Sequence, residues 1–338
     1  MIQLSTIQRC AKILIEKDAL YIKNFANKDN AALLPIFIPY LALFSCGAEK
    51  WYKNINKQSV FSDDIRIKKL YDEIRQSIKY FDDSLDNLSN RLWIEYKKSD
   101  SYFASQLNDL AHLLNVKHYN IGMIRVGETF CSNTILCASY LPQYNFIKEY
   151  SQIVYEISVI AGHITAIFTR DQKKYIKSKI DFFQEDFNLD YKSPFTFNKN
   201  NLSIFCMKNR IDYVTEILDK YFVEETIFPF RIAYLEYYYL SNMIDSINTC
   251  TNCQFSINSS YSNKSFRNMM AHYGIGQGME EIDLIDNDPL FGMTQKYFSI
   301  SFFEFKKIIM QELRQLGEQF TKYISLDMTC LGNGIIIG

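Results

Sequence analysis

The sequence predicts an all-α protein, a helical bundle with an N-terminal and a C-terminal helical domain. Apolar residues recur at helical spacing over several long stretches. Glycine (12) and proline (6) are scarce among the 338 residues, so the chain lacks the turn residues that many short strands need. Hydrophobic residues make up 48% of the chain and charged residues 22%, which excludes a disordered chain and a collagen-like fibre.

The first long apolar stretch, residues 31–48, contains no charged side chain and reaches the minimum length of a membrane span. Pro35 and Pro39 argue against a span, because each removes a backbone hydrogen bond that lipid cannot replace. We therefore expect a buried helix or helix pair here and no contact with a membrane. No signal peptide is visible and eight cysteines are spread along the chain. These features predict a cytoplasmic protein with free thiols.

A long amphipathic helix is predicted over residues 67–92. Its apolar positions are three or four residues apart, and charged residues occupy the other faces. The stripe fits packing within a bundle, and a coiled-coil seam between two chains is the alternative. The apolar positions are Ile67, Leu70, Ile74, Ile78, Phe81, Leu85, Leu88 and Leu92.

A second amphipathic helix, over residues 153–167, is expected to continue into a basic segment. Arg170, Lys173, Lys174 and Lys177 follow at helical spacing, which would place four positive charges on one face. These residues are candidates for RNA binding, with a solvated helix face as the alternative. The 37 basic and 38 acidic residues of the whole chain cancel, so any polyanion site must be local.

A polar, irregular segment at residues 186–201 predicts a domain boundary. Residues 1–200 would form the N-terminal helical domain, and residues 201–338 the C-terminal one. Within the latter, helices are expected at residues 207–222, at residues 230–248, around Arg267 and at residues 299–324. Cys250 and Cys253 form one CxxC, but no second ligand pair accompanies it, so we expect two ordinary thiols, no metal and no cofactor.

The most specific local signal lies in residues 265–274. Asn268 and His272 are four residues apart and share one face of a helix, whereas Arg267 lies about 140° around the axis from His272. The long Arg267 side chain must therefore curl, or the helix end must distort, for both groups to reach one phosphate.

This segment resembles the R-x4-6-H motif of the HEPN superfamily, in its frequent form with asparagine after the arginine and alanine before the histidine. The resemblance extends over residues 202–324, with two helices before the motif and a long amphipathic helix after it. It implies an all-helical domain with two motifs facing one another across a homodimer. Many members are metal-independent endoribonucleases of toxin, antiphage-defence and CRISPR-associated systems, and others are inactive binding or scaffold modules. The matched run is Arg267-Asn268-Met269-Met270-Ala271-His272.

The residue types suit that chemistry. Cleavage of RNA without a metal needs a group that titrates near neutrality and a fixed cation for the charge that develops on the phosphate. His272 and Arg267 are groups of these two types, and Asn268 is placed to orient the imidazole or to donate to the phosphate. In the alternative interpretation, His272 only caps the helix and Arg267 makes a surface ion pair.

Glu236 is a further candidate for the site. It lies on the edge of the apolar face of the preceding predicted helix, where a carboxylate needs a partner if it is buried. Arg267 is a candidate partner, and an exposed flanking position is the alternative. His163, in an apolar stretch, is expected to be a buried core residue.

The expected function is a metal-independent endoribonuclease of a toxin or antiphage-defence system. It would act on RNA as a homodimer, with an antitoxin or defence-system protein as a further partner, and residues 1–200 would sense a trigger or bind that partner. The alternative is a catalytically inactive HEPN-like module that binds protein or RNA. Five acidic residues between positions 280 and 288 count against RNA in the cleft, because they would repel its backbone.

Overall fold

The computed structural model describes residues 4–60, 65–78, 84–107, 116–141, 146–169, 172–275, 278–285, 288–330 and 335–337. This part of the chain is mostly helical, which confirms the predicted fold class. It also contains one small sheet that was not predicted.

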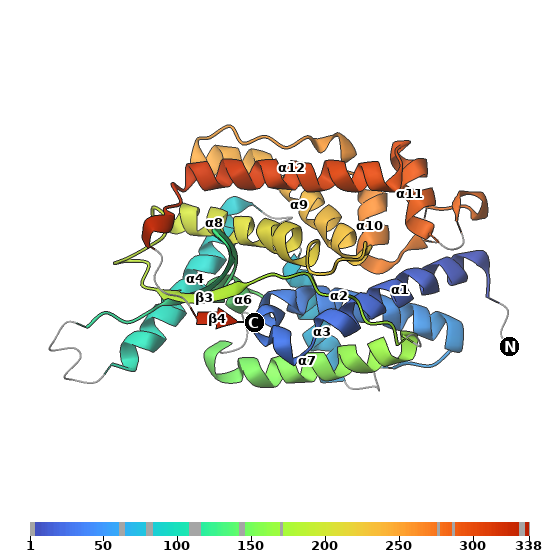
Figure 1. The fold of residues 1–338 in the computed structure, drawn as a ribbon, viewed down its shortest axis with the longest axis horizontal. Coiled ribbons are helices and arrows are strands. Elements are labelled where there is room, and N and C mark those ends of the chain that lie inside the picture. Colours follow the sequence, from blue (N-terminus) through green and yellow to red (C-terminus); the bar gives the residue numbers. More distant parts are fainter. Residues whose placement is uncertain are drawn as a thin grey trace.

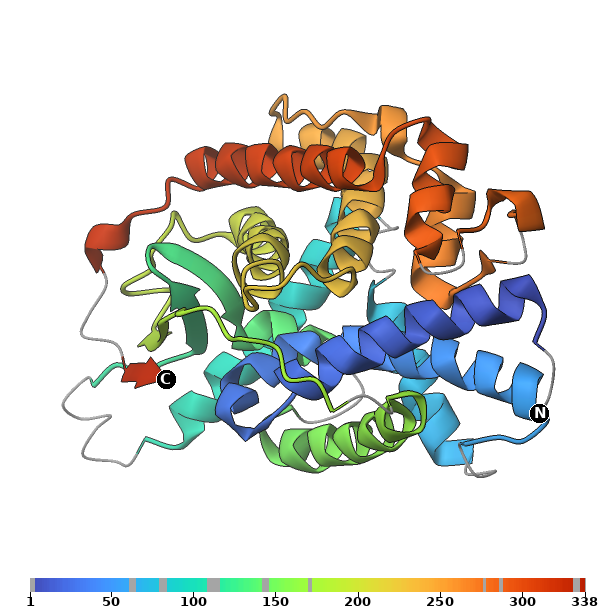
Figure 2. The same cartoon turned by 45° about the vertical axis from the view of Figure 1, so that its right-hand side comes forward.

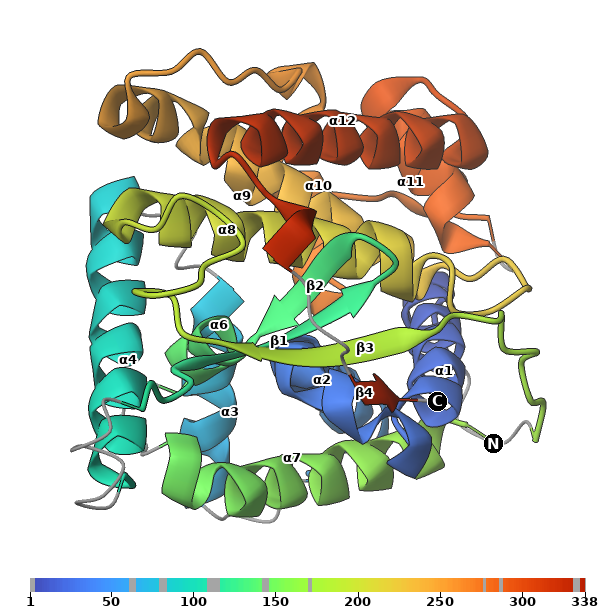
Figure 3. The ribbon, with the colours of Figure 1, turned by 60° about the vertical axis from the view of Figure 1, so that its left-hand side comes forward.

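The helices form two groups, one on either side of the sheet, as Figure 1 and Figure 3 show. The first group contains α1 (Thr6–Phe25), α2 (Leu34–Asn56), α3 (Ile65–Ser77) and α7 (Phe146–Phe168). The second contains α8 (Lys199–Asp212), α9 (Phe228–Thr251), α10 (Lys264–His272), α11 (Pro289–Phe298) and α12 (Phe302–Tyr323). Two helices beside the sheet, α4 (Leu85–Ser105) and α6 (Thr134–Ser139), contact one another and strand β1.

The sheet is antiparallel and joins segments that are far apart in the sequence. Its strands lie in the order β2-β1-β3-β4. Asn209 of α8 donates to the carbonyl of Phe130 at 3.0 Å and accepts from Asn133 at 2.6 Å, so these polar groups fasten β2 to the second group of helices. The strands are β1 (Ile121–Val126), β2 (Thr129–Asn133), β3 (Phe182–Phe187) and β4 (Ile335–Ile337).

The uncharged segment expected to be buried forms the central helix α2. Pro35 lies in its first turn, where the missing N–H costs nothing, and Pro39 lies inside the helix. Among the described residues, one segment, Asp29–Asn56, is long and apolar enough to cross a membrane, and 72% of its most apolar window is buried inside the protein. Its neighbours are α1, α3, α7 and α10, so α2 is packed as a core helix is.

The prediction of one long helix over residues 67–92 is wrong, because two helices share this region. α3 ends at Ser77 and α4 begins at Leu85. Ser84 caps α4 by accepting from the backbone N–H of Asn87, and the N–H of Leu85 donates to the Ser246 hydroxyl at 2.9 Å. The apolar residues keep helical spacing from α3 to α4, so the spacing alone does not reveal that a new helix begins at the Ser84 cap. Phe81 lies outside the described residues.

The predicted basic helix face is also wrong. α7 ends at Phe168, and residues 172–181 are not helical. Instead, the backbone there bonds to another segment: Ser178 donates to the Tyr221 carbonyl at 2.8 Å, and Val223 donates to the Ile176 carbonyl at 2.9 Å. The spacing of charges in the sequence does not show that this segment pairs with residues 221–223 instead of continuing α7.

Lys173, Lys174 and Lys177 therefore do not share one helix face. Lys177 forms an ion pair with Asp29 at 3.2 Å, Lys173 and Lys174 are exposed, and Arg170 lies outside the described residues. Burial alone would lower the pKa of Lys177, but its hydrogen bonds to Asp29 and Tyr221 raise it.

The C-terminal helices agree better with expectation. α9, α10 and α12 begin and end within a few residues of the predicted positions, whereas α11 was not predicted. α8 begins earlier than expected, at Lys199, because Asn198 accepts from the N–H of Asn201 at 2.9 Å and caps it. It continues into a π-helical turn at Tyr213–Leu218. Apolar residues from both sides of position 200 share one core cluster, and the division into two domains there stays a prediction.

One close approach fixes α2 against the end of α10. A Cβ atom added to Gly47 would lie 2.5 Å from Cδ2 of the fully buried Tyr273 ring. In α7, by contrast, a Cβ atom added to Gly162 would meet no atom within 4 Å.

We expect opposite effects of the same substitution at these two helical glycines. Gly47→Ala should lower the free energy of unfolding by about 1–3 kcal/mol, because the buried ring has no room to move away. Gly162→Ala should raise it by up to about 1 kcal/mol, since alanine is the better helix former. Urea unfolding of the two variants measures both effects, and stabilisation by Gly47→Ala would contradict the close approach.

Candidate functional site

The Arg267–His272 run forms α10, as predicted. Asn263 caps the helix by accepting from the N–H of Phe266 at 2.9 Å. The helix ends after His272, because Tyr273 adopts a left-handed conformation with φ 52°. Two side chains of the run, Asn268 and His272, are half-buried.

Arg267 occupies a different environment from the one expected. Its residue is only 8% exposed, so the surface ion pair of the alternative interpretation is wrong. Its guanidinium carbon lies 5.0 Å from the ring centre of Tyr238 and 5.5 Å from that of Tyr239, both on α9. Its Nε has no hydrogen-bond partner among the described residues. The cation is thus held by aromatic rings, with donor capacity left over.

The backbone that follows His272 is held by the N-terminal helices. The indole N–H of Trp51 on α2 donates to the carbonyl of Tyr273 at 2.8 Å. The Tyr273 hydroxyl donates to Asp18 of α1 at 2.6 Å. In Figure 2, α1 (blue) lies between α7 (green) and the orange helices α10 and α11. The N-terminal half of the chain therefore sets the position of the end of α10, and with it the backbone of His272.

Asp18 also binds Arg231 of α9, in an ion pair whose two members are almost completely inaccessible. The Arg231 guanidinium stacks 3.9 Å from the ring centre of Tyr273 and donates to the carbonyl of Met270. Burial lowers the pKa of Arg231 and raises that of Tyr273, and the positive charge of Arg231 partly opposes the second effect. Neither Asp18 nor Arg231 was predicted, although Asp18 lies on the apolar stripe of α1 between Leu14 and Ile22, a signal of a buried carboxylate.

Both expectations for Glu236 are wrong. Its side chain is 1% exposed, and its carboxylate accepts from Arg210 of α8 at 2.5 Å and from the Tyr40 hydroxyl at 3.0 Å. Arg267 is therefore not its ion-pair partner. Burial alone would lower the pKa of Arg210, but the charge of Glu236 raises it well above its usual value. The pair joins α8, α9 and α2 in the core.

The acidic loop after the motif is partly neutralised. Asp283 binds Lys296, and Asp288 binds Lys17 of α1. The hydrogen bond from Lys296 lowers the pKa of Asp283. Glu280 and Glu281 are exposed, and the fifth acid, Asp286, lies outside the described residues. The repulsion expected from five like charges is thereby reduced.

Two other histidines of the described residues, His118 and His163, do not join this site. His163 is exposed on α7, so its assignment to the core is wrong: Ile157, Ala161 and Ile164 occupy the inward positions. His118 binds Asp100 at 2.8 Å, and His112 lies outside the described residues. Within the described ranges, no three His, Cys, Asp or Glu side chains are placed to hold a metal ion.

Removal of the Asp18 charge should destabilise the protein strongly. Asp18→Asn would leave Arg231 buried without a counter-charge, which costs about 3–5 kcal/mol. Glu16→Gln on the same helix removes a partly exposed ion pair with Lys12 and should cost less than about 1 kcal/mol. Urea unfolding compares the two variants, and equal losses would contradict the dependence on a buried ion pair.

Comparison of the chain with family models, curated proteins and solved structures gave no significant match in any of the three.

Proposed function

We propose that the protein is a metal-independent endoribonuclease of a toxin or antiphage-defence system. His272 acts as general acid or base, Arg267 stabilises the charge on the phosphate, and Asn268 assists one of them. The assignment to such a system comes from the resemblance of the α10 sequence to the HEPN motif. The observation that best supports this chemistry is that Arg267 is buried against tyrosine rings, with no carboxylate partner among the described residues.

Three arginines of the second helical group are buried, and they differ in how their charge is balanced. Arg210 binds Glu236 and Arg231 binds Asp18. In the described ranges no carboxylate lies within ion-pair distance of Arg267, whose guanidinium rests on tyrosine rings. A buried guanidinium without a carboxylate can bind an anionic group strongly, because the low dielectric around it increases the attraction. A phosphate suits the guanidinium fork, because two of its oxygens can accept two parallel N–H hydrogen bonds.

His272 supplies the second function. It is half-buried, five residues after Arg267 at the end of α10. Histidine is the side chain type whose ordinary pKa lies nearest neutrality, and removal of the 2′-OH proton needs a group of that type. Lys173 and Lys174 remain candidate contacts for RNA phosphates, since both are exposed.

One observation favours the second candidate function, a catalytically inactive module that binds protein or RNA. Arg267 is 8% exposed, so little of its side chain is open to a phosphate. In an inactive module, the guanidinium would serve only to join α10 to the rings of α9.

RNA cleavage tests the proposal directly. Purified protein, with and without a co-expressed partner, should cleave total RNA or a tRNA pool in EDTA. His272→Ala should reduce the rate at least about 100-fold, as loss of a general acid or base does. Arg267→Lys keeps the charge but removes the fork, and should reduce the rate by about the same factor.

His163→Ala is the matched control, because this exposed histidine of α7 lies outside the site; it should cleave as the wild type does. Circular dichroism must show that every variant is folded. Cleavage at the wild-type rate by both site variants would contradict the catalytic assignment. RNA binding without cleavage by the wild type would support the inactive module.

We also expect the active form to be a homodimer. One motif supplies a single His272 and a single Arg267, which is only part of the acid, the base and the charge stabilisation that the reaction uses. Two motifs together supply one histidine as the acid and one as the base. Light scattering at micromolar concentration should therefore give the mass of a dimer. A protein that cleaves RNA while it remains a monomer would contradict this prediction.

A further inference from the structure

The C-terminal half of α2 lies directly against the end of α10. A Cβ atom added to Gly47 would lie 3.7 Å from the carbonyl carbon of His272. Lys50 and Trp51 follow Gly47 by three and four residues, so both lie within about 60° of it around the axis of an ideal helix. The indole N–H of Trp51 donates to the carbonyl of Tyr273 at 2.8 Å, which places its ring next to the backbone that follows His272.

The ring of Trp51 is partly exposed, and among the described residues no other aromatic ring packs against it. The second tryptophan of the chain differs in this respect. Trp93 stacks on Phe197 with 5.7 Å between the ring centres, and its ring centre lies 5.0 Å from that of Tyr96. A tryptophan that is fixed by its N–H and has no aromatic neighbour offers a prepared surface for a planar group of a ligand.

Exposed lysines lie near this ring on both helices. Lys50 and Lys53, in the last turns of α2, form no ion pair within the described ranges. Lys264, at the start of α10, is also exposed and has no acidic partner there. It precedes Asn268 and His272 by four and eight residues, so the three side chains form one row along α10. A strand of RNA that follows this row to its end reaches the indole.

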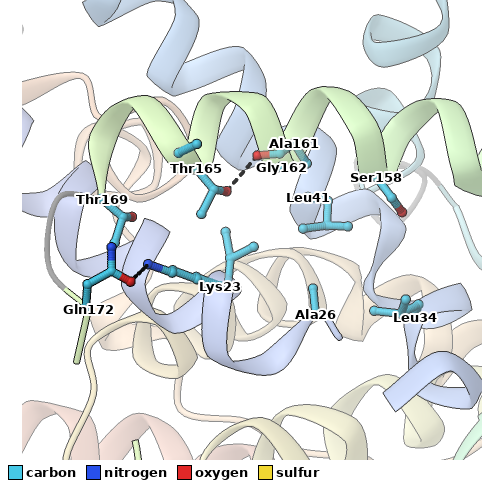
Figure 4. Close-up of a pocket in the computed structure, with 12 residues that line it drawn as sticks. Lys23, Ala26, Leu34, Leu41, Ser158, Ala161, Gly162, Thr165, Thr169 and Gln172 are labelled. Carbon is cyan, nitrogen blue, oxygen red and sulfur yellow. Dashed lines mark hydrogen bonds between the residues drawn. The ribbon is translucent and has the colours of Figure 1, made fainter. Parts of the chain in front are cut away.

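A groove elsewhere on α2 offers no comparable surface (Figure 4). It lies between α1, α2 and α7, and its α2 walls are Leu34 and Leu41, which precede Trp51 by ten residues or more. None of the described residues that line it carries an aromatic ring. Proteins bind the bases of single-stranded RNA by stacking them on aromatic side chains. The groove therefore lacks the group that a base needs, and Trp51 provides it.

We propose that Trp51 stacks a base of the RNA next to the scissile phosphate, while Lys50 contacts a phosphate of the same strand. The inference rests on the proposed function, because it places the substrate at His272. It names single-stranded RNA as the substrate class, since a base within a duplex is already stacked on its neighbours and does not reach the indole. The N-terminal helices then touch the substrate in addition to supporting α10.

The fluorescence of Trp51 tests the proposal without cleavage. In a Trp93→Phe variant Trp51 is the only tryptophan, since the chain has two. The probe is a single-stranded RNA of about ten 2′-O-methyl nucleotides, an ordinary site size, which cannot be cleaved because its 2′ oxygens carry no proton. It should quench the emission of Trp51. The same RNA in a duplex should bind at least about tenfold more weakly, because a base must first leave the stack.

Two substitutions separate the ring from its hydrogen bond. Trp51→Phe and Trp51→Leu both lose the N–H that donates to Tyr273, and only the first keeps an aromatic face. Trp51→Leu should weaken RNA binding about 5- to 100-fold, the usual contribution of one stacked base. Trp51→Phe should stay within about threefold of the wild type. With cleavable RNA, the loss in Trp51→Leu should appear in KM more than in kcat.

The salt dependence of binding tests the contact of Lys50. Lys50→Gln should reduce the slope of log affinity against log salt concentration by about 0.7, the value for one phosphate of a single strand. Lys322→Gln is the matched control, because this exposed lysine lies at the C-terminal end of α12, which Figure 1 shows far from α10. It should leave the slope unchanged. An unchanged slope in Lys50→Gln would remove Lys50 from the proposal.

The outcomes distinguish this inference from the nuclease assignment. If the wild type cleaves RNA but the emission of Trp51 does not change, or if Trp51→Phe and Trp51→Leu lose affinity equally, the stacking contact is wrong and the nuclease assignment stands. Quenching without cleavage would support the contact and favour the RNA-binding module. Absence of any RNA binding would overturn both. The emission of Trp51 decides the matter even if a Trp51 variant does not fold.

Discussion

The ion pair between Asp18 and Arg231 is the interaction on which the arrangement of the candidate site depends. The two charges are buried together, and each would be strongly unfavourable alone. They connect α1 to α9, and through Tyr273 and the Met270 carbonyl they connect both helices to the end of α10. These three helices must therefore assemble together, although Asp18 and Arg231 are 213 positions apart in the sequence. The close contact of Gly47 with Tyr273 adds α2 to the same unit.

The sequence predicted those parts of the fold that local periodicity determines. α7, α9 and α12 each carry a regular apolar stripe, and each lies close to its expected position. The sheet could not be predicted in this way, because β3 pairs with a three-residue strand about 150 residues further along the chain. The ends of helices were equally hidden. Ser84 caps α4 in the middle of a continuous apolar stripe, and pairing with residues 221–223 replaces the expected helix after Phe168.

At the candidate site, the sequence predicted the motif but not the partners of its charges. α10 and its half-buried histidine are where the Arg267–His272 spacing indicated. The partner of Glu236 depends on how α8 packs against α9, and no local pattern distinguishes Arg210 from Arg267 for that role. A carboxylate or arginine inside an apolar run does predict burial, as Asp18, Arg231 and Glu236 all show. It does not identify the residue that neutralises it.

The position of Arg267 brings the stability of the fold and the proposed chemistry into opposition. The rings of Tyr238 and Tyr239 offset only part of the cost of burying a guanidinium, since a cation–π contact contributes about 0.5–2 kcal/mol. An Arg267 paired with a carboxylate would be more stable but would have its charge already neutralised. A site that must attract a phosphate needs the less stable arrangement, held in place by its surroundings. Those surroundings are present: α9 supplies the rings, and Asp18, Trp51 and Gly47 fix the end of α10. The N-terminal helices thus have a structural part in the proposed site even though they contribute none of its reacting groups.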